Sequence, residues 1–216
     1  TILVVNLLVS LAGFRALRAP AELTAEPGGG SEPAGLLADP ESYLFSPYQI
    51  AQGRWGVGAV LSNMAHSGWL HLAFNMFALV SFAGGVFEAV GWPRFLLLYV
   101  VAGIGCNLVV YLLRRDDPAY RALGASGSVF GIVAAAVVID PTISIAFIFV
   151  PIPIPGPVFL SAYLAISIFL LARNTRDGIS HEGHLGGAVA GFLLRGLLLP
   201  EGFSTLFAWI RQALGG

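Results

Sequence analysis

The chain has 216 residues, of which 56% are hydrophobic and 11% are charged, and its mean hydropathy is +0.81. Soluble domains carry about 25% charged residues, so the composition predicts an integral membrane protein. Every basic residue is arginine, and twelve acidic residues nearly balance eleven arginines. We therefore expect no nucleic acid partner, because no basic surface is available for one. The single Cys106 has no second cysteine for a disulfide or a CxxC site.

Six apolar runs are candidate membrane-spanning helices. A span needs about 20 apolar residues, or fewer where neighbouring helices shield it. The candidates lie at residues 1–17, 68–90, 94–113, 124–139, 157–172 and 184–199. No basic region precedes the first run, so we interpret it as a transmembrane helix that starts before Thr1, rather than as a signal peptide.

The connections between these runs are of two kinds. A polar, acidic connection at 18–54 follows the first run, and its length predicts a loop on the membrane surface. Alternating prolines exclude a helix from residues 142–156, which are expected to form a partly extended connection. We predict an all-α fold: one membrane domain of six helices over residues 1–199, followed by a tail, 200–216, that is a candidate for the membrane interface.

Strongly polar residues collect at the beginning of every second apolar run. If six helices cross in turn, the second, fourth and sixth begin at the same face of the membrane. Polar groups within spans are costly and usually mark function, so a single shared site is expected there. Its candidate members are His66, His71, Asn75, Ser126, His181 and His184.

The depth of Ser126 follows from the length of the fourth run. Asp140 and Pro141 end that run, because proline disfavours helical geometry in the residue before it. The helix from Ser126 to Asp140 is about 21 Å long, against a hydrocarbon core of roughly 30 Å, which puts Ser126 about 10 Å below the surface. A serine at that depth needs a water-filled recess, unless it is a buried hydroxyl bonded to its own helix.

Ser126 lies among small residues in the stretch GASGSVFG, and these favour close packing of helices. Gly127 and Gly131 in this stretch are four residues apart. Glycines recur at that spacing on the last predicted helix, at Gly183, Gly187 and Gly191. Packing alone would explain them, but a serine becomes a nucleophile only with a base about 3 Å away. Glycine faces would bring His184 that close. His184 is the candidate base, since imidazole titrates near neutral pH, although a histidine capping its helix is the alternative.

His71 and Asn75 are spaced i, i+4 and should share a helix face. Such a pair can donate two hydrogen bonds to an oxyanion, although Asn75 alone is also explained as a buried polar group that holds helices together. The four histidines offer another interpretation, a zinc or iron site. His181 and His184 are separated by i, i+3 rather than the i, i+4 of the H-E-x-x-H motif, and we expect no metal.

Three motifs together resemble the rhomboid family of intramembrane serine proteases. They are MAHSGWLHLAFNM at 64–76, GASG at 124–127 and GHLGGAVAG at 183–191. The resemblance covers about residues 55–199 and implies a six-helix rhomboid-like bundle with a long first loop. It also implies an endopeptidase that cleaves transmembrane segments of membrane proteins without a metal or organic cofactor. We expect a multi-pass protein of a prokaryotic inner membrane, with the lipid bilayer and transmembrane substrates as its partners.

The resemblance implies roles for individual residues. Ser126 would be the nucleophile and His184 the general base. His71, Asn75 and the Ser126 backbone N–H would donate hydrogen bonds to the oxyanion. Residues implied to support the site are His66, Gly124, Gly127, Phe130 and Gly187.

Three questions stay open at the level of the sequence. A catalytically silent relative that binds membrane clients would keep the fold, and a metal-dependent enzyme would need the histidines but not Ser126. An outward-facing site would leave eight of the eleven arginines outside the membrane, against the positive-inside tendency, so orientation is not predicted. Neither is the oligomeric state.

Overall fold

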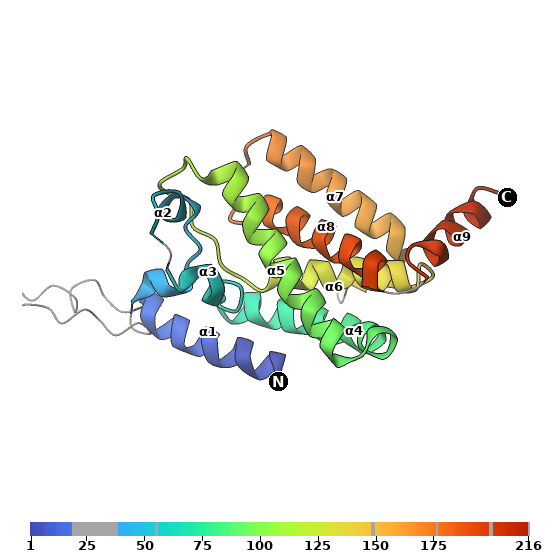
Figure 1. The fold of residues 1–216 in the computed structure, drawn as a ribbon, viewed down its shortest axis with the longest axis horizontal. Coiled ribbons are helices and arrows are strands. Elements are labelled where there is room, and N and C mark those ends of the chain that lie inside the picture. Colours follow the sequence, from blue (N-terminus) through green and yellow to red (C-terminus); the bar gives the residue numbers. More distant parts are fainter. Residues whose placement is uncertain (19–38, 55, 148–149, 176, 199–200, 216) are drawn as a thin grey trace, which may run out of the picture. The chain divides into compact units, whose positions relative to one another are not determined.

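The computed structural model describes residues 1–18, 39–54, 56–147, 150–175, 177–198 and 201–215. Within these ranges the chain forms nine α-helices, one short 3-10 helix and one two-stranded sheet, coloured from α1 (blue) to α9 (red) in Figure 1. The chain divides into two compact units. The first comprises Thr1–Phe77 and Tyr111–Ala125, and the second comprises Ala78–Val110 and Ser126–Gly216.

The first unit begins with the apolar helix α1. Its elements are α1 (Ile2–Arg18), η2 (Pro40–Tyr43), α2 (Pro47–Ala51), α3 (Gly58–Leu61) and the start of α4 (Trp69–Val90). Asp39 caps η2 and Ser46 caps α2, each accepting a hydrogen bond from a backbone N–H of its helix. The loop predicted at 18–54 lies partly outside the described residues, and its described part, 39–54, forms these two capped turns.

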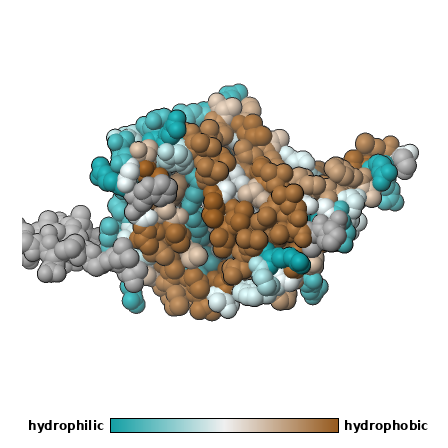
Figure 2. Space-filling view, viewed as in Figure 1, coloured by the Kyte–Doolittle hydropathy of each residue, from teal (hydrophilic) through white to brown (hydrophobic). Residues whose placement is uncertain are grey.

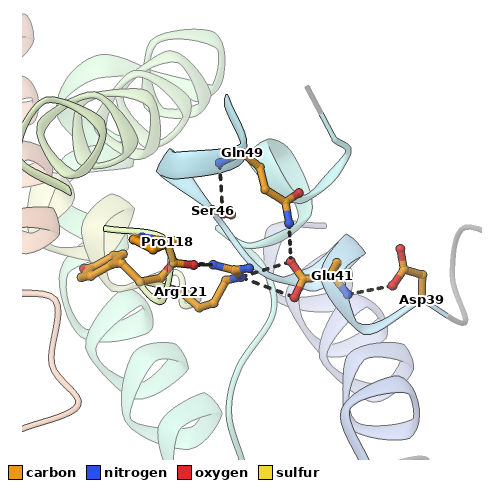
Figure 3. A network of polar contacts seen from close by, with 7 residues as sticks. Asp39, Glu41, Ser46, Gln49, Pro118 and Arg121 are labelled. Carbon is orange, nitrogen blue, oxygen red and sulfur yellow. Dashed lines mark hydrogen bonds and ion pairs between the residues drawn. The ribbon is translucent and has the colours of Figure 1, made fainter. Parts of the chain in front are cut away.

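Polar contacts join two distant segments of the first unit (Figure 3). Arg121 Nε donates to Glu41 Oε2 at 3.1 Å, and Arg121 Nη1 donates to the Pro118 carbonyl at 3.0 Å. A β-bridge between Phe45 and Ala122 joins the same two segments. These bonds hold residues 118–122, the stretch that leads toward Ser126, against η2 and the segment that follows it.

The second unit contains the remaining helices and the sheet. Its elements are most of α5 (Trp92–Arg114), the end of α4, α6 (Ser126–Ile139), β1 (Ser144–Phe147), β2 (Val150–Pro155), α7 (Gly156–Ala172), α8 (His181–Leu198) and α9 (Ser204–Ala213). Helix α8 packs against both α6 and α7. A buried cluster of Ala134, Val137, Leu160 and Ala188 forms the core between these three helices.

All six predicted apolar runs correspond to helices, namely α1, α4, α5, α6, α7 and α8. The largest difference in bounds is at α8, which begins at His181 rather than at residue 184. Among the described helices, α4 and α5 are long and apolar enough to cross a membrane by length and composition, while α1, α6 and α7 are apolar but shorter.

The mostly helical fold is interrupted at the connection between α6 and α7, where residues predicted to be partly extended form two strands. Strands β1 and β2 pair there as an antiparallel hairpin, with Ser144 opposite Pro155 and Ile145 opposite Ile154. Successive N–H groups of a strand point to opposite edges. The prolines occupy every second position of β2, so all of them can place the missing N–H at the edge that β1 does not use.

Apolar side chains cover much of the molecular face drawn in Figure 2. Leu70 on α4, Ile104 on α5 and Leu197 on α8 are exposed by 74%, 60% and 82%. Large apolar surfaces of this kind are unstable in water and mark contact with lipid or another protein.

Candidate active site

Helices α6 and α8 run parallel and touch through their backbones. A Cβ atom at Gly187 would overlap the carbonyl oxygen of Gly127, and one at Gly191 would overlap that of Gly131. Both contacts advance in the same direction along the two helices, which shows that the helices are parallel. The glycines predicted to permit close approach therefore lie where the two backbones meet.

Helix α5 closes the other side of this contact. A Cβ atom at Gly131 would overlap that of Ala102, and one at Gly127 would lie 2.5 Å from the Cys106 side chain. Gly105 meets the backbone of Gly186 in the same way. Three helices thus meet at glycine positions, and their spacing leaves no room for larger side chains.

The close contact brings Ser126 and His184 together. Ser126 is the first residue of α6 and His184 lies in the first turn of α8. Ser180 begins α8 by accepting a hydrogen bond from the Gly183 N–H at 3.2 Å, which is why the helix starts earlier than predicted. The Ser126 Oγ lies 2.7 Å from the His184 Nε2, within the reach that a serine nucleophile needs from its base.

The opposite nitrogen of His184 also has a partner. His184 Nδ1 lies 2.5 Å from the hydroxyl oxygen of Tyr163, which comes from α7. Phe130 stacks on both rings, with centroid distances of 4.7 Å to His184 and 4.3 Å to Tyr163. Phe130 was among the residues that the resemblance implied, whereas the sequence reasoning missed Tyr163. The available signal was a tyrosine one helical turn before Ser167 in a mostly apolar run.

His181 does not join His184 at a metal site. Its Nε2 lies 3.1 Å from Asp177 Oδ2 instead. The hydrogen bond to His181, followed by that from the Ile179 N–H, lowers the pKa of Asp177 below its ordinary value. Over the described ranges, no group of three histidine, cysteine or acidic side chains is placed to hold a metal ion.

The other predicted site residues lie in the first unit. His71 and Asn75 both belong to α4, and Asn75 Nδ2 donates to the His71 carbonyl at 2.9 Å. His66 precedes α4, and its ring meets that of His71 edge-on at a centroid distance of 4.9 Å. His66 Nδ1 lies 2.8 Å from Ser10 Oγ. Burial, and secondly the nearby His71, lower the pKa of the fully buried His66 to about 4.

Gly124 supports the stretch before Ser126 through its backbone. Its φ of +134° is a conformation that other residues rarely adopt. Its N–H donates to the Ser62 carbonyl at 2.8 Å. The glycine thus allows the chain to turn two residues before α6 begins.

A family model described as the rhomboid domain matches residues 54–201, which is more than half of the chain. The chain belongs to the rhomboid family. Membership implies a polytopic membrane fold, and it confirms the resemblance drawn from the three motifs. The matched rhomboid domain includes Ser126, His184 and Tyr163.

Relatives of this rhomboid occur in animals, plants and bacteria. The presenilin-associated rhomboid-like protein, mitochondrial, of Mus musculus is 31% identical over 134 residues, covering 61% of this chain and 35% of the relative. Rhomboid protease AarA of Providencia stuartii is 31% identical over 153 residues, covering 62% and 53%. RHOMBOID-like protein 4 of Arabidopsis thaliana is 28% identical over 167 residues, covering 77% and 39%. The chain thus spans between about a third and a half of the length of these relatives.

Proposed function

We propose that this chain is an intramembrane serine endopeptidase that cleaves transmembrane segments of other membrane proteins with a Ser126–His184 dyad. The single observation that carries the proposal is the 2.7 Å separation of Ser126 Oγ and His184 Nε2. Family membership supports it, because one relative bears the name of a rhomboid protease.

The proposed reaction proceeds in two steps. Ser126 Oγ attacks the carbonyl carbon of the scissile peptide, and its proton passes to His184 Nε2. The proton then moves to the leaving amine as the C–N bond breaks, which leaves an acyl-enzyme. A water molecule, deprotonated by the same nitrogen, attacks the ester carbonyl and releases the acid together with free Ser126.

The oxyanion donors stay a prediction. The Ser126 N–H is suited to be one of these donors, because the first four N–H groups of a helix have no partner within the helix. His71 is suited to donate from Nε2, since its Nδ1 accepts a hydrogen bond from the Ser67 backbone N–H at 3.4 Å and must then be unprotonated. Asn75 keeps one amide hydrogen beyond the one given to the His71 carbonyl.

The membrane topology proposed here has six crossings, made by α1, α4, α5, α6, α7 and α8. Helices α1, α6 and α7 are short for a bilayer, so this topology requires neighbouring helices to shield their ends. In this arrangement the first loop and α9 lie at the membrane surface. The prokaryotic inner membrane is part of the same proposal.

The test is cleavage of a reporter protein with a single transmembrane segment by the purified chain in detergent. We expect Ser126→Ala and His184→Asn each to lower kcat by at least about 10³-fold, because the dyad acts as a unit. Ser128→Ala is the matched control, since Ser128 is a buried serine one residue beyond Gly127 on the same helix. It should retain activity.

Three outcomes would contradict the proposal. Full cleavage by Ser126→Ala would show that another group attacks the peptide. Loss of wild-type activity with a strong chelator, at unchanged thermal stability, would favour the metal-dependent alternative. Binding of the reporter without cleavage by any form of the protein would favour the catalytically silent relative.

A further inference from the structure

Tyr163 makes a polar contact with the His184 ring that the proposed reaction does not use. Its hydroxyl meets Nδ1, the ring nitrogen opposite the one that faces Ser126. Helix α7 carries Tyr163, and α7 packs on α8 within the second unit. The contact therefore belongs to the same compact unit as the dyad itself.

The protonation pattern of His184 decides what this contact can do. Nε2 accepts the Ser126 proton only if it carries none, so the neutral ring must hold its single hydrogen on Nδ1. A tyrosine hydroxyl oxygen can accept that hydrogen. In the other tautomer, the hydroxyl would donate to Nδ1, and Nε2 would already hold a hydrogen directed at Ser126 Oγ, which blocks proton transfer.

The same bond suits the charged ring that forms during the reaction. Once Nε2 has taken the proton, both ring nitrogens are donors, and Nδ1–H still points at the Tyr163 oxygen. An acceptor at this position serves the resting and the protonated state without any rearrangement, which is the basis of preorganised catalysis.

Stacking holds the hydroxyl in place. Phe130 lies against Tyr163 with an angle of 20° between the ring planes, and against His184 with an angle of 28°. Phe159, one turn before Tyr163 on α7, also stacks on the Tyr163 ring, at a centroid distance of 6.1 Å. The ring of Tyr163 is therefore positioned by aromatic neighbours, and its hydroxyl can be removed without moving it.

We propose that Tyr163 is a positioning residue that holds His184 in the tautomer with hydrogen on Nδ1, ready to accept the Ser126 proton. The inference rests on the proposed function, because it assigns His184 the role of base. Tyr163 does not touch the reacting atoms and acts through His184 alone.

The direct test is ¹⁵N NMR of protein labelled at its four histidines in detergent, with the His184 signals assigned by comparison with His184→Asn. At a pH where the ring is neutral, wild-type His184 should be protonated mainly on Nδ1. Tyr163→Phe keeps the stacked ring and removes the hydroxyl, and should shift the tautomer ratio toward Nε2–H by about fivefold to tenfold. Tyr111→Phe, a hydroxyl removed from α5, should leave the ratio unchanged.

Kinetics give a second measurement. Reaction of Ser126 with a fluorophosphonate probe, and reporter cleavage, should both slow about tenfold in Tyr163→Phe, with the loss in kcat and KM unchanged. An unchanged tautomer ratio in a folded Tyr163→Phe protein would overturn the inference even if the protein cleaves its reporter. If no form cleaves the reporter, the proposed function fails, while the NMR result still decides whether Tyr163 orients His184.

Discussion

His184 has a different partner on each ring nitrogen and an aromatic ring against its face, and these three contacts come from two helices, α6 and α7. Ser126 and Phe130 lie one turn apart on α6, and Tyr163 lies on α7. An imidazole with both nitrogens and one face in contact has little freedom to rotate. The role of His184 therefore depends on which ring nitrogen carries a hydrogen, because the position of the ring is already fixed by its neighbours.

His66 gives a pH dependence to the stability of the protein. Its pKa is lowered to about 4 in the fold, whereas a histidine in the unfolded chain titrates near 6.5. The unfolded state thus takes up a proton first as the pH falls. The stability that neutral His66 permits is fully present above about pH 6.5 and is lost progressively toward pH 4, by up to about 3 kcal/mol for this group.

The measurement is thermal unfolding in detergent at pH 7.5 and pH 5.0. Wild-type protein should lose more of its Tm on acidification than His66→Gln, which has no proton to bind at this site. The comparison uses the change with pH, because the variant also loses the contact with Ser10. Equal losses in the two proteins would show that His66 does not titrate in this window.

Single residues differ in how far the sequence predicts them. Ser126 and His184 stand out because polar groups are rare in an apolar chain, and each lies at or near the beginning of an apolar run. Tyr163 does not stand out, because α7 is mostly apolar all round and its sequence leaves open which face turns toward α8. Only the packing of α7 reveals the partner of Nδ1.

At the scale of elements, the contact between α6 and α8 is sensitive to one methyl group. We expect Gly187→Ala to lower stability by about 1–3 kcal/mol, because its Cβ would overlap backbone atoms of Gly127 that cannot turn aside. The helices must then separate, and a shift approaching 1 Å at the dyad costs activity by as much as about 10²-fold.

Gly85→Ala is the matched control for this prediction. Gly85 also lies in a helix, α4, but a Cβ there would meet nothing within 4 Å. Alanine is favoured over glycine in helices by about 0.5–1 kcal/mol, so this variant should be as stable as wild type or more so. Reporter cleavage and Tm are measured for both variants, and similar values for the two would refute the role given to the glycine contact.

Some elements could be predicted from the local sequence and others could not. Apolar runs and Asp140-Pro141 predicted six helices closely, since each depends on local composition. The hairpin β1–β2 was not predicted, because strand pairing depends on two segments meeting, and prolines alone indicate only that residues 142–156 are not helical. The predicted start of α8 was three residues too late for a simpler reason. The cap at Ser180 lies in a polar stretch outside the apolar run.

For the whole molecule, the proposed membrane setting predicts which substrates are cut. The carbonyls of a continuous substrate helix are hydrogen-bonded and shielded in the bilayer. Substrates with glycine or proline near the membrane surface, and small side chains beside the scissile bond, should therefore be cleaved faster than a segment of continuous leucine. The measurement compares cleavage rates of two reporters that differ only by a Gly-Gly pair replaced by Leu-Leu.

This comparison tests how easily the substrate helix opens, because the same enzyme and dyad act on both reporters. A further reporter with the glycine pair moved to the centre of the segment serves as its control, because it weakens the helix away from the surface. If the leucine reporter were cut as fast as the one with glycine near the surface, opening of the substrate helix would not limit the reaction.

The backbone contact of α6 with α8 also bears on how freely the rest of this protein can change over evolutionary time. Main-chain atoms are the same in every residue, so a separation set by Gly127 against Gly187 does not depend on which side chains cover the outer faces of the two helices. The side chains on those outer faces can therefore be substituted as the surrounding membrane changes. A few glycines are enough to keep the distance between Ser126 and His184.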